Sequence, residues 1–223
     1  SDVYKRQEQH NEVCRLIRAI GDFRKEANPR VTGYEFHILT MVSYVAPKHL
    51  IVDKLRETLE EIKTREPDAA DKYRARVVFV GSEVDDVDVI RLVEESGAYV
   101  CADRFCYGSL PGRDEILLND DEDVVKQICR QVQGRAQCPR YWDMAKMTGR
   151  RDYVADLAKE YGADGIIYEQ MKFCDPWAYE RMIGTIVLRD EHGYPVLAVD
   201  RPYSIGSSGQ MRTRVQAFVE SIE

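Results

Sequence analysis

The spacing of apolar residues divides the chain into a helical part and a longer part in which strands and helices alternate. Residues 3–66 repeat apolar positions every three or four residues, which is typical of amphipathic helices. The pattern predicts a first helix near the N-terminus, a second over residues 34–45, and a third after Pro47, since proline suits the first turn of a helix. The tripeptide Glu66-Pro67-Asp68 ends this helical part.

From Arg76 onward the pattern changes to short apolar runs separated by helical stretches. Strands are predicted over residues 76–80, 97–102, 165–168 and 195–199. Helices are predicted over residues 87–95, 121–132, 151–161, 177–188 and 210–222. Strands that alternate with helices imply right-handed crossovers and a parallel sheet. We therefore predict an α/β fold: a doubly wound four-stranded parallel sheet of Rossmann or flavodoxin type over residues 73–223, preceded by a helical segment over residues 1–72.

Composition and charge narrow the class of protein. The 223 residues are 44% hydrophobic and 32% charged, which is ordinary for a soluble globular protein. A net charge of −7 argues against a general role in coating nucleic acid. No apolar run has the length of a membrane span and no signal peptide opens the chain, so we expect a cytoplasmic protein with neither membrane nor nucleic-acid partners. Because the chain starts at Ser1 rather than at a methionine, we also expect a fragment truncated at its N-terminus.

The six cysteines show no disulfide framework, so reduced thiols of a cytosolic protein are expected. Cys14, Cys101 and Cys129 lie inside predicted helices or strands. Free cysteine is among the residues most often buried, and we predict that these three fill the core.

The other three cysteines, Cys106, Cys138 and Cys174, lie in loops near the expected carboxyl ends of the strands. Open α/β sheets bind their ligands at this edge, and thiolate is the ligand that selects iron–sulfur clusters, zinc or copper(I). No Cys-x-x-Cys pair is present, so the compact ferredoxin and zinc-ribbon patterns are absent. Each of these cysteines is therefore a metal ligand or a half-buried thiol, and spacing alone does not decide between the two.

Glu169 and Gln170 directly follow the predicted strand 165–168, which places an ionisable group at the same edge of the sheet. Burial would raise the pKa of the Glu169 carboxyl and make it a candidate catalytic proton carrier. The alternative is a structural carboxylate held by hydrogen bonds.

Ser207, Ser208, Gly209 and Gln210 stand directly before or in the first turn of the last predicted helix. Free backbone N–H groups at a helix N-terminus bind phosphate or carboxylate, so we predict an anion site here, with Arg212 and Arg214 in support. The alternative is a serine N-cap flanked by glycine turns.

A second glycine-containing loop, Gly108-Ser-Leu-Pro-Gly112, is flanked by Arg104 and Arg113. It is either a phosphate clamp or a surface turn with solvated arginines. Neither a P-loop nor a dinucleotide fingerprint is present, because Gly81-Ser-Glu-Val after the first predicted strand has no glycine repeat.

Three segments together resemble the D-component family of 2-hydroxyacyl-CoA dehydratases, which includes 2-hydroxyglutaryl-CoA dehydratase and benzoyl-CoA reductase subunits. They are Ala102-Asp-Arg-Phe-Cys-Tyr-Gly-Ser-Leu-Pro-Gly, Asp164-Gly-Ile-Ile-Tyr-Glu-Gln-Met-Lys-Phe-Cys-Asp-Pro-Trp, and Asp200-Arg-Pro-Tyr through Ser207-Ser-Gly-Gln-Met-Arg-Thr-Arg-Val-Gln-Ala-Phe. Their order and spacing also fit, and the resemblance extends over nearly the whole chain.

The resemblance implies a subunit of two α/β domains that holds a 4Fe-4S cluster through three cysteines. Such a subunit pairs with a homologous sister subunit and receives an electron from an ATP-hydrolysing iron–sulfur activator. In the dehydratases the electron enters the thioester of a 2-hydroxyacyl-CoA, and a ketyl radical expels the hydroxyl to give an enoyl-CoA. In the reductases the acceptor is an aromatic thioester. The implied chemistry is anaerobic.

By this resemblance Cys174 is a cluster ligand, whereas most partner cysteines belong to a first domain that the chain lacks. One thiolate cannot hold a cluster, so the isolated chain is expected to be inactive. Cys106 and Cys138 are not assigned as ligands. Two other functions stay open: a non-catalytic relay or assembly subunit, and a flavodoxin-like nucleotide module, against which the missing phosphate fingerprint counts.

Overall fold

The computed structural model describes residues 2–67, 72–110, 113–135, 137–141, 143–203 and 208–223. The strands are β1 (Ala75–Gly81), β2 (Ala98–Arg104), β3 (Gly165–Met171) and β4 (Val196–Arg201). The α-helices are α1 (Asp2–Asp22), α2 (Gly33–Val45), α3 (Lys48–Thr64), α4 (Val87–Glu95), α5 (Val124–Arg135), α6 (Met144–Glu160), α7 (Asp175–Asp190) and α8 (Ser208–Ile222). A short 3-10 helix, η1 (Phe23–Lys25), follows α1.

The described strands form one four-stranded sheet with the order β2-β1-β3-β4, and every neighbouring pair is parallel. This order is that of a flavodoxin-like sheet, so the predicted doubly wound fold is confirmed. The register aligns Val80 of β1 with Tyr168 of β3, and Tyr168 with Ala198 of β4. The carboxyl ends of the strands therefore lie along one edge of the sheet.

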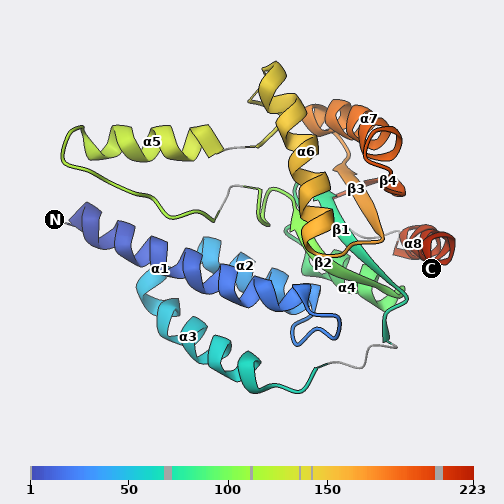
Figure 1. Cartoon of the computed structure of the whole chain (residues 1–223), viewed down its shortest axis with the longest axis horizontal. Coiled ribbons are helices and arrows are strands. Elements are labelled where there is room, and N and C mark those ends of the chain that lie inside the picture. The colour runs from blue at the N-terminus through green and yellow to red at the C-terminus, as the bar shows by residue number, and fades with distance from the viewer. Residues whose placement is uncertain (1, 68–71, 111–112, 136, 142, 204–207) are drawn as a thin grey trace.

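Alternate residues of each strand supply two apolar cores, one on each face of the sheet. Val77 and Phe79 of β1 pack with α4 and α8 on one face. Val78 and Val80 pack with α6 and α7 on the other. Figure 1 shows the resulting layers, with the two termini far apart.

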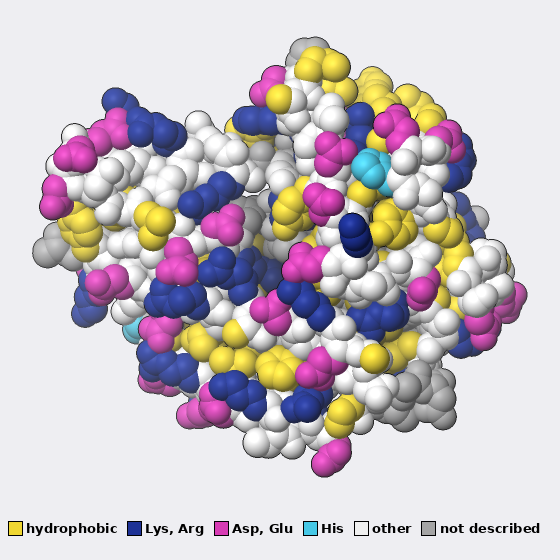
Figure 2. All heavy atoms as spheres, viewed as in Figure 1, with side chains coloured by type: hydrophobic (Ala, Val, Ile, Leu, Met, Phe, Trp, Pro, Cys, Tyr) yellow, Lys and Arg dark blue, Asp and Glu magenta, His cyan; other side chains and the backbone are white. Residues whose placement is uncertain are grey.

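The segment before α5 and α5 itself form an arm that lies beside α1 (Figure 1). Asn11 of α1 exchanges two hydrogen bonds with the backbone of Ile116, at 2.9 and 2.8 Å. α5 packs through the buried amide of Gln127, which bonds the backbone of Asn119. Between α1, α5 and α6 the surface is hollowed and carries charged side chains of both signs (Figure 2).

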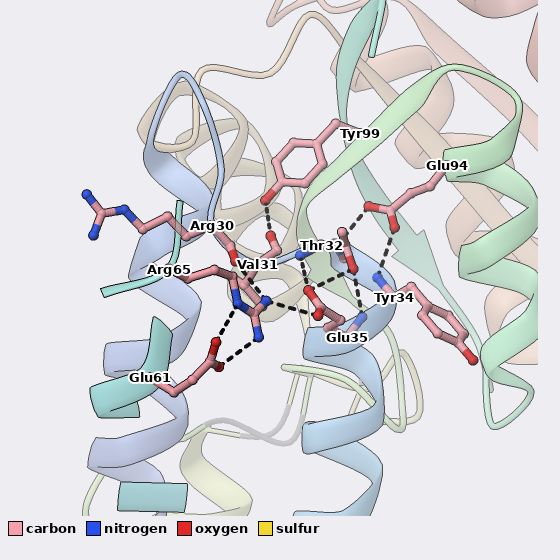
Figure 3. A network of polar contacts seen from close by, with 10 residues as sticks. Arg30, Val31, Thr32, Tyr34, Glu35, Glu61, Arg65, Glu94 and Tyr99 are labelled. Atoms are coloured by element: carbon pink, nitrogen blue, oxygen red, sulfur yellow. Dashed lines mark hydrogen bonds and ion pairs between the residues drawn. The ribbon is translucent and has the colours of Figure 1, made fainter. Parts of the chain in front are cut away.

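Helices α1, α2 and α3 share an apolar cluster of their own, and the N-terminus of α2 attaches them to the sheet (Figure 3). Thr32 and Glu35 form a reciprocal capping box at this helix start. The hydroxyl of Tyr99 on β2 donates to the carbonyl of Val31 at 2.8 Å. Whether residues 1–72 and 73–223 are separate domains stays a prediction.

Glu94, at the end of α4, holds the N-terminus of α2 with its carboxylate. It accepts the backbone N–H groups of Gly33 at 2.8 Å and Tyr34 at 3.1 Å (Figure 3). It also accepts the N–H of Val100 at 3.3 Å. A negative charge is favourable at a helix N-terminus. A Cβ at Gly33 would lie 2.7 Å from the backbone oxygen of Val100, so only glycine allows this approach. Burial outweighs the three N–H donors and raises the pKa of Glu94 to about 7.

Two helix starts differ from the sequence prediction by three residues or more, and one cysteine differs in burial. α5 begins at Val124 rather than at residue 121, because the side chain of Asp123 caps the helix by accepting the N–H of Lys126. α6 begins at Met144 rather than at residue 151, because the side chain of Asp143 accepts the N–H of Lys146 in the same way. Cys14 and Cys101 are buried as predicted, but Cys129 is exposed, so the prediction that it fills the core is wrong. The cause is that α5 packs through Gln127 and turns its apolar residues outward.

The raised pKa of Glu94 predicts a pH-dependent stability. The folded chain holds this proton to about pH 7, whereas an unfolded glutamate loses it near pH 4.3. Stability is therefore present in full at low pH and falls as the pH rises through this window. Glu94→Gln cannot titrate, and we expect a shallower fall between pH 5 and pH 8 in urea denaturation followed by circular dichroism.

Asp88→Asn, on the exposed first turn of the same helix, is the matched control and should keep the native slope. Parallel curves for native chain and Glu94→Gln would contradict the assignment.

Candidate functional site

The sheet's carboxyl edge gathers most of the polar and sulfur-bearing residues singled out in the sequence. β1 ends at Gly81, β2 at Arg104, β3 at Met171 and β4 at Arg201. In an open α/β sheet this is the edge where ligands bind.

Cys174 lies where β3 passes into α7, at the N-cap position of that helix. Its N–H donates to the carbonyl of Met171 at 3.1 Å, which closes a tight turn. Phe173 within this turn has φ 72°, a left-handed conformation that is unusual for a bulky residue, and its side chain is 96% exposed. Pro176 suits the first turn of α7. The local backbone thus places the Cys174 thiol in front of a helix N-terminus.

Trp177 lies between Cys174 and Cys106. Cys106, Cys138 and Cys174 are all half-buried and pack against the apolar cluster that contains Trp177. Cys138 and Cys174 each raise the pKa of the Cys106 thiol, so the three sulfurs lie in one neighbourhood. Their spacing in the sequence did not show this convergence.

The thiols differ in how readily they ionise. Burial is the main cause that raises the pKa of Cys106 to about 12. Burial also raises the pKa of Cys174, but the backbone N–H of Trp177 opposes it. The indole Nε1 of Trp177 is buried without a hydrogen bond of normal geometry, although it lies near enough to Cys106 to lower that thiol's pKa. The indole N–H of Trp177 thus lies beside Cys106, whereas the backbone N–H of the same residue favours the thiolate form of Cys174.

Within the described ranges, no group of three or more His, Cys, Asp or Glu side chains is arranged to hold a metal ion. Cys174 therefore fits a metal centre as one ligand of a larger set, not as part of a complete one.

Glu169 lies inside β3 rather than after it and is completely buried. Its Oε2 accepts the backbone N–H of Ser82 at 3.0 Å and the Ser82 hydroxyl at 2.9 Å, and the same hydroxyl accepts the N–H of Met171 at 2.6 Å. Its Oε1 lies 2.9 Å from Nε of Arg201 in an ion pair without good hydrogen-bond geometry. A Cβ at Gly81 would come within 2.4 Å of the Glu169 carbonyl, so glycine is needed for this packing.

Burial raises the pKa of Glu169 to about 7, while Arg201 and Ser82 act in the opposite direction. A pKa near neutrality suits a proton carrier, yet the side chain has no exposed surface and each oxygen has a partner. The contacts favour the structural alternative, and the catalytic role of Glu169 stays a prediction. Gln170 accepts a hydrogen bond from Arg181 at 3.1 Å.

The anion site predicted before α8 falls partly outside the described residues. Ser207 is not described, Ser208 begins α8, and Gly209 and Gln210 are exposed in its first turn. The two arginines predicted to support it turn elsewhere: Arg212 pairs with Glu95 at 2.9 Å, and Arg214 donates to the carbonyl of Ala198 at 2.7 Å. Anion binding at this helix start stays a prediction.

Sequence reasoning missed Ser82 and Arg201 as partners of Glu169, and Trp177 as the residue between the thiols. Ser82 follows Gly81 at a strand end, and a polar residue there was a usable signal. Arg201 stood inside a quoted segment, but its pairing with Glu169 depends on the neighbouring strands β3 and β4. In the part of the chain that is described, no helix has both the length and the apolar character needed to cross a membrane.

Comparisons with known proteins agree on one family. The sequence matches the family described as 2-hydroxyglutaryl-CoA dehydratase, D-component, over residues 2–222. It is 29% identical over 182 residues to the (R)-phenyllactyl-CoA dehydratase beta subunit of Clostridium sporogenes, with 81% of this chain and 46% of that protein aligned.

Two further relatives represent different activities. The (R)-2-hydroxyglutaryl-CoA dehydratase subunit beta of Acidaminococcus fermentans is 26% identical over 78% of this chain and 46% of its own length. A subunit of the benzoyl-CoA reductase of Thauera aromatica is 22% identical over 96% of this chain and 55% of its own length. The chain spans about half the length of the curated relatives it matches.

The contacts of Glu169 predict a large effect on stability. Glu169→Ala leaves Arg201 buried without its carboxylate, and breaking a buried pair in this way costs about 3–5 kcal/mol of unfolding free energy. Replacing both charges, as Glu169→Leu with Arg201→Met, should recover much of the loss because no lone charge remains. Urea denaturation of both variants checks this, with Glu191→Ala on the exposed end of α7 as the control. A loss below about 1 kcal/mol for Glu169→Ala would contradict the structural role, since that is the value of an ordinary surface change.

Proposed function

Because this chain belongs to the 2-hydroxyglutaryl-CoA dehydratase D-component family, we propose that it is part of a subunit of an iron–sulfur 2-hydroxyacyl-CoA dehydratase. The reaction is the removal of water from a 2-hydroxyacyl-CoA to give an enoyl-CoA. The observation that carries the proposal is the position of Cys174, a half-buried thiol at the carboxyl end of a central strand and the N-terminus of α7.

A 4Fe-4S cluster is the cofactor of this proposal, and when bound it would supply one-electron chemistry at low potential. Cys174 would be one of its ligands. Trp177 would orient that ligand through its backbone N–H, which already favours the thiolate form of Cys174. The further thiolates would come from the half of the relatives' length that this chain does not align with.

The other partners follow from the same proposal. A homologous sister subunit would complete the assembly, and an ATP-hydrolysing iron–sulfur activator would deliver the electron. The substrate would be an acyl-CoA thioester, and the setting would be anaerobic and cytoplasmic. The isolated chain would be inactive, because it holds one ligand of the set.

A second candidate is a subunit of the benzoyl-CoA reductase type that reduces an aromatic acyl-CoA. The benzoyl-CoA reductase relative from Thauera aromatica supports it, since that alignment extends over 96% of this chain. A non-catalytic subunit that only relays electrons or assembles a partner is the third candidate. Addition of thioester substrate separates this last one from the other two, since only a substrate-binding subunit would change its cluster spectrum.

The cluster proposal predicts the effect of removing one thiol. In the full-length protein, extended through the region that the relatives share and purified without oxygen, Cys174→Ala should lose most of its iron and its brown absorbance. Iron analysis and visible spectroscopy measure both. Cys129→Ala removes an exposed thiol on α5 and should keep the native iron content.

A colourless, iron-free native full-length protein would refute the cluster, and full iron content in Cys174→Ala would refute its role as a ligand.

A further inference from the structure

A cavity of about 410 Å³ lies beside β2, between α1 and η1 on one side and α6 on the other. β2 is an edge strand of the sheet, so this space is bounded by helices rather than by another strand. The surface hollow between α1, α5 and α6 in Figure 2 marks its position. Pockets for small molecules have volumes of about 300–1,000 Å³. The cavity is thus large enough for a small metabolite.

Five arginines and four carboxylates line the cavity, and the carboxylates all have cationic partners. Asp103 pairs with Arg24 at 3.1 Å, and Asp114 lies 3.6 Å from Arg18. Asp22 and Glu160 both pair with Lys25, at 2.8 and 2.6 Å. Arg24, Arg18, Arg135 and Lys25 are therefore the ion-pair partners of these acids within 4.0 Å, while Arg104 and Arg113 act on Asp103 from a longer distance.

Arg104 is a buried cation without a carboxylate partner. Its side chain is 4% exposed, and no carboxylate of the described residues lies within 4.0 Å of it. Its Nε donates to the amide oxygen of Gln137 at 3.0 Å and its Nη1 to the carbonyl of Ser109 at 2.5 Å. The guanidinium lies over the ring of Tyr153, 4.2 Å from its centroid. Burying a charge is unfavourable unless it is paired, so this position is suited to an anion.

Arg113 is a second cation without a carboxylate partner, although it is half-buried rather than buried. It donates to the hydroxyl of Thr40 at 3.0 Å and lies 4.9 Å from the centroid of Phe36, again with no carboxylate within 4.0 Å among the described residues. Burial is the main cause that lowers the pKa of Arg104; Tyr153 and Asp103 oppose it, and the charge of Arg113 lowers it further, so the two guanidinium groups are near enough to repel each other. An anion between them would remove this repulsion.

Arg24 adds a buried donor to the same lining. It is 4% exposed, and its Nε has no hydrogen-bond partner among the described residues although its Nη2 bonds Asp103. Converging guanidinium groups bind the oxygens of phosphate in pairs, with geometry that a single lysine does not provide.

We infer that this cavity binds the phosphoryl group of a small phosphorylated metabolite, held between Arg104 and Arg113. The inference does not depend on the proposed dehydratase function, since it rests on residues other than Cys174. In the described part of the predicted glycine-containing loop, Ser109 accepts a hydrogen bond from Arg104, which is buried rather than solvated.

Isothermal titration calorimetry on this chain tests the site with inorganic phosphate, ADP, coenzyme A and succinate as probes. We expect the phosphate-bearing probes to bind and the dicarboxylate succinate to bind much more weakly. Equal affinity for phosphate and the two esters would identify free phosphate as the ligand, whereas tighter binding of an ester would identify a phosphorylated metabolite that fills more of the cavity. Binding of the phosphate esters should weaken between pH 7.5 and pH 5.5, because a phosphomonoester loses its second charge near pH 6.

Arg113→Gln should weaken phosphate binding by about tenfold or more, the value of a hydrogen bond to a charged group. Arg104→Gln should do the same. If the Arg104→Gln variant fails to fold, the phosphate affinities of Arg104→Lys and of Arg113→Gln, whose side chain is partly exposed, test the site instead. Arg189→Gln on α7 removes the same charge from an exposed pair with Asp190 and should leave the affinity unchanged.

Three results would overturn the inference. They are no binding of any phosphate-bearing probe at millimolar concentration, succinate binding as tight as phosphate, and an unchanged affinity in both Arg113→Gln and a folded Arg104 variant.

Discussion

The buried pair of Glu169 and Arg201 is the interaction on which the carboxyl edge depends. Glu169 comes from β3, Arg201 from the end of β4, and Ser82, the second partner of Glu169, from the residue after β1. One carboxylate thus joins the ends of three neighbouring strands. Cys174 follows β3 by only three residues, so the position of its thiol depends on where this strand ends. The pair is costly to break because either charge alone would remain buried.

A second carboxylate, that of Glu94, joins the helical part to the sheet. Glu94 binds the first backbone N–H groups of α2, and so attaches helices α1 to α3 to the sheet. Glu169 is buried and Glu94 is half-buried; both accept backbone N–H groups, and desolvation raises the pKa of each to about 7. Their hydrogen bonds and charged partners make buried acids tolerable at the positions where elements meet.

The attachment of the helical part also creates the cavity beside β2. Arg24 comes from η1, Arg104 from β2 and Arg113 from the segment before α5, so three separate stretches supply its cations. Among the described residues the lining acids form their ion pairs with Arg24, Arg18, Arg135 and Lys25, so Arg104 and Arg113 have no carboxylate within 4.0 Å. The proposed cluster ligand and the proposed phosphoryl site therefore depend on different residues and are tested separately.

The order of helices and strands, the parallel sheet and the burial of Cys14 and Cys101 were predictable from the sequence, because apolar periodicity is a local property. The sequence also indicated that Cys174 and Arg104 lie close to strand ends, and the structure has both of them there. Helix starts were less predictable. Asp123 and Asp143 cap α5 and α6 at positions where the spacing of apolar residues does not mark the start of a helix.

Tertiary structure alone decided which residues meet. Glu169 and Ser82 are 87 positions apart, and Arg24 and Asp103 are 79 apart. Such pairs leave no periodic signal, because each depends on strand order and on the docking of whole helices. The exposure of Cys129 has the same origin: its helix is amphipathic in sequence, but contacts through Gln127 determine which face turns inward. The sequence by itself determined the elements and the chemistry available at their ends. The packing of those elements decided that the Glu169 carboxylate is enclosed, that three thiols share one neighbourhood, and that Arg104 and Arg113 line a cavity with no carboxylate within 4.0 Å of either among the described residues.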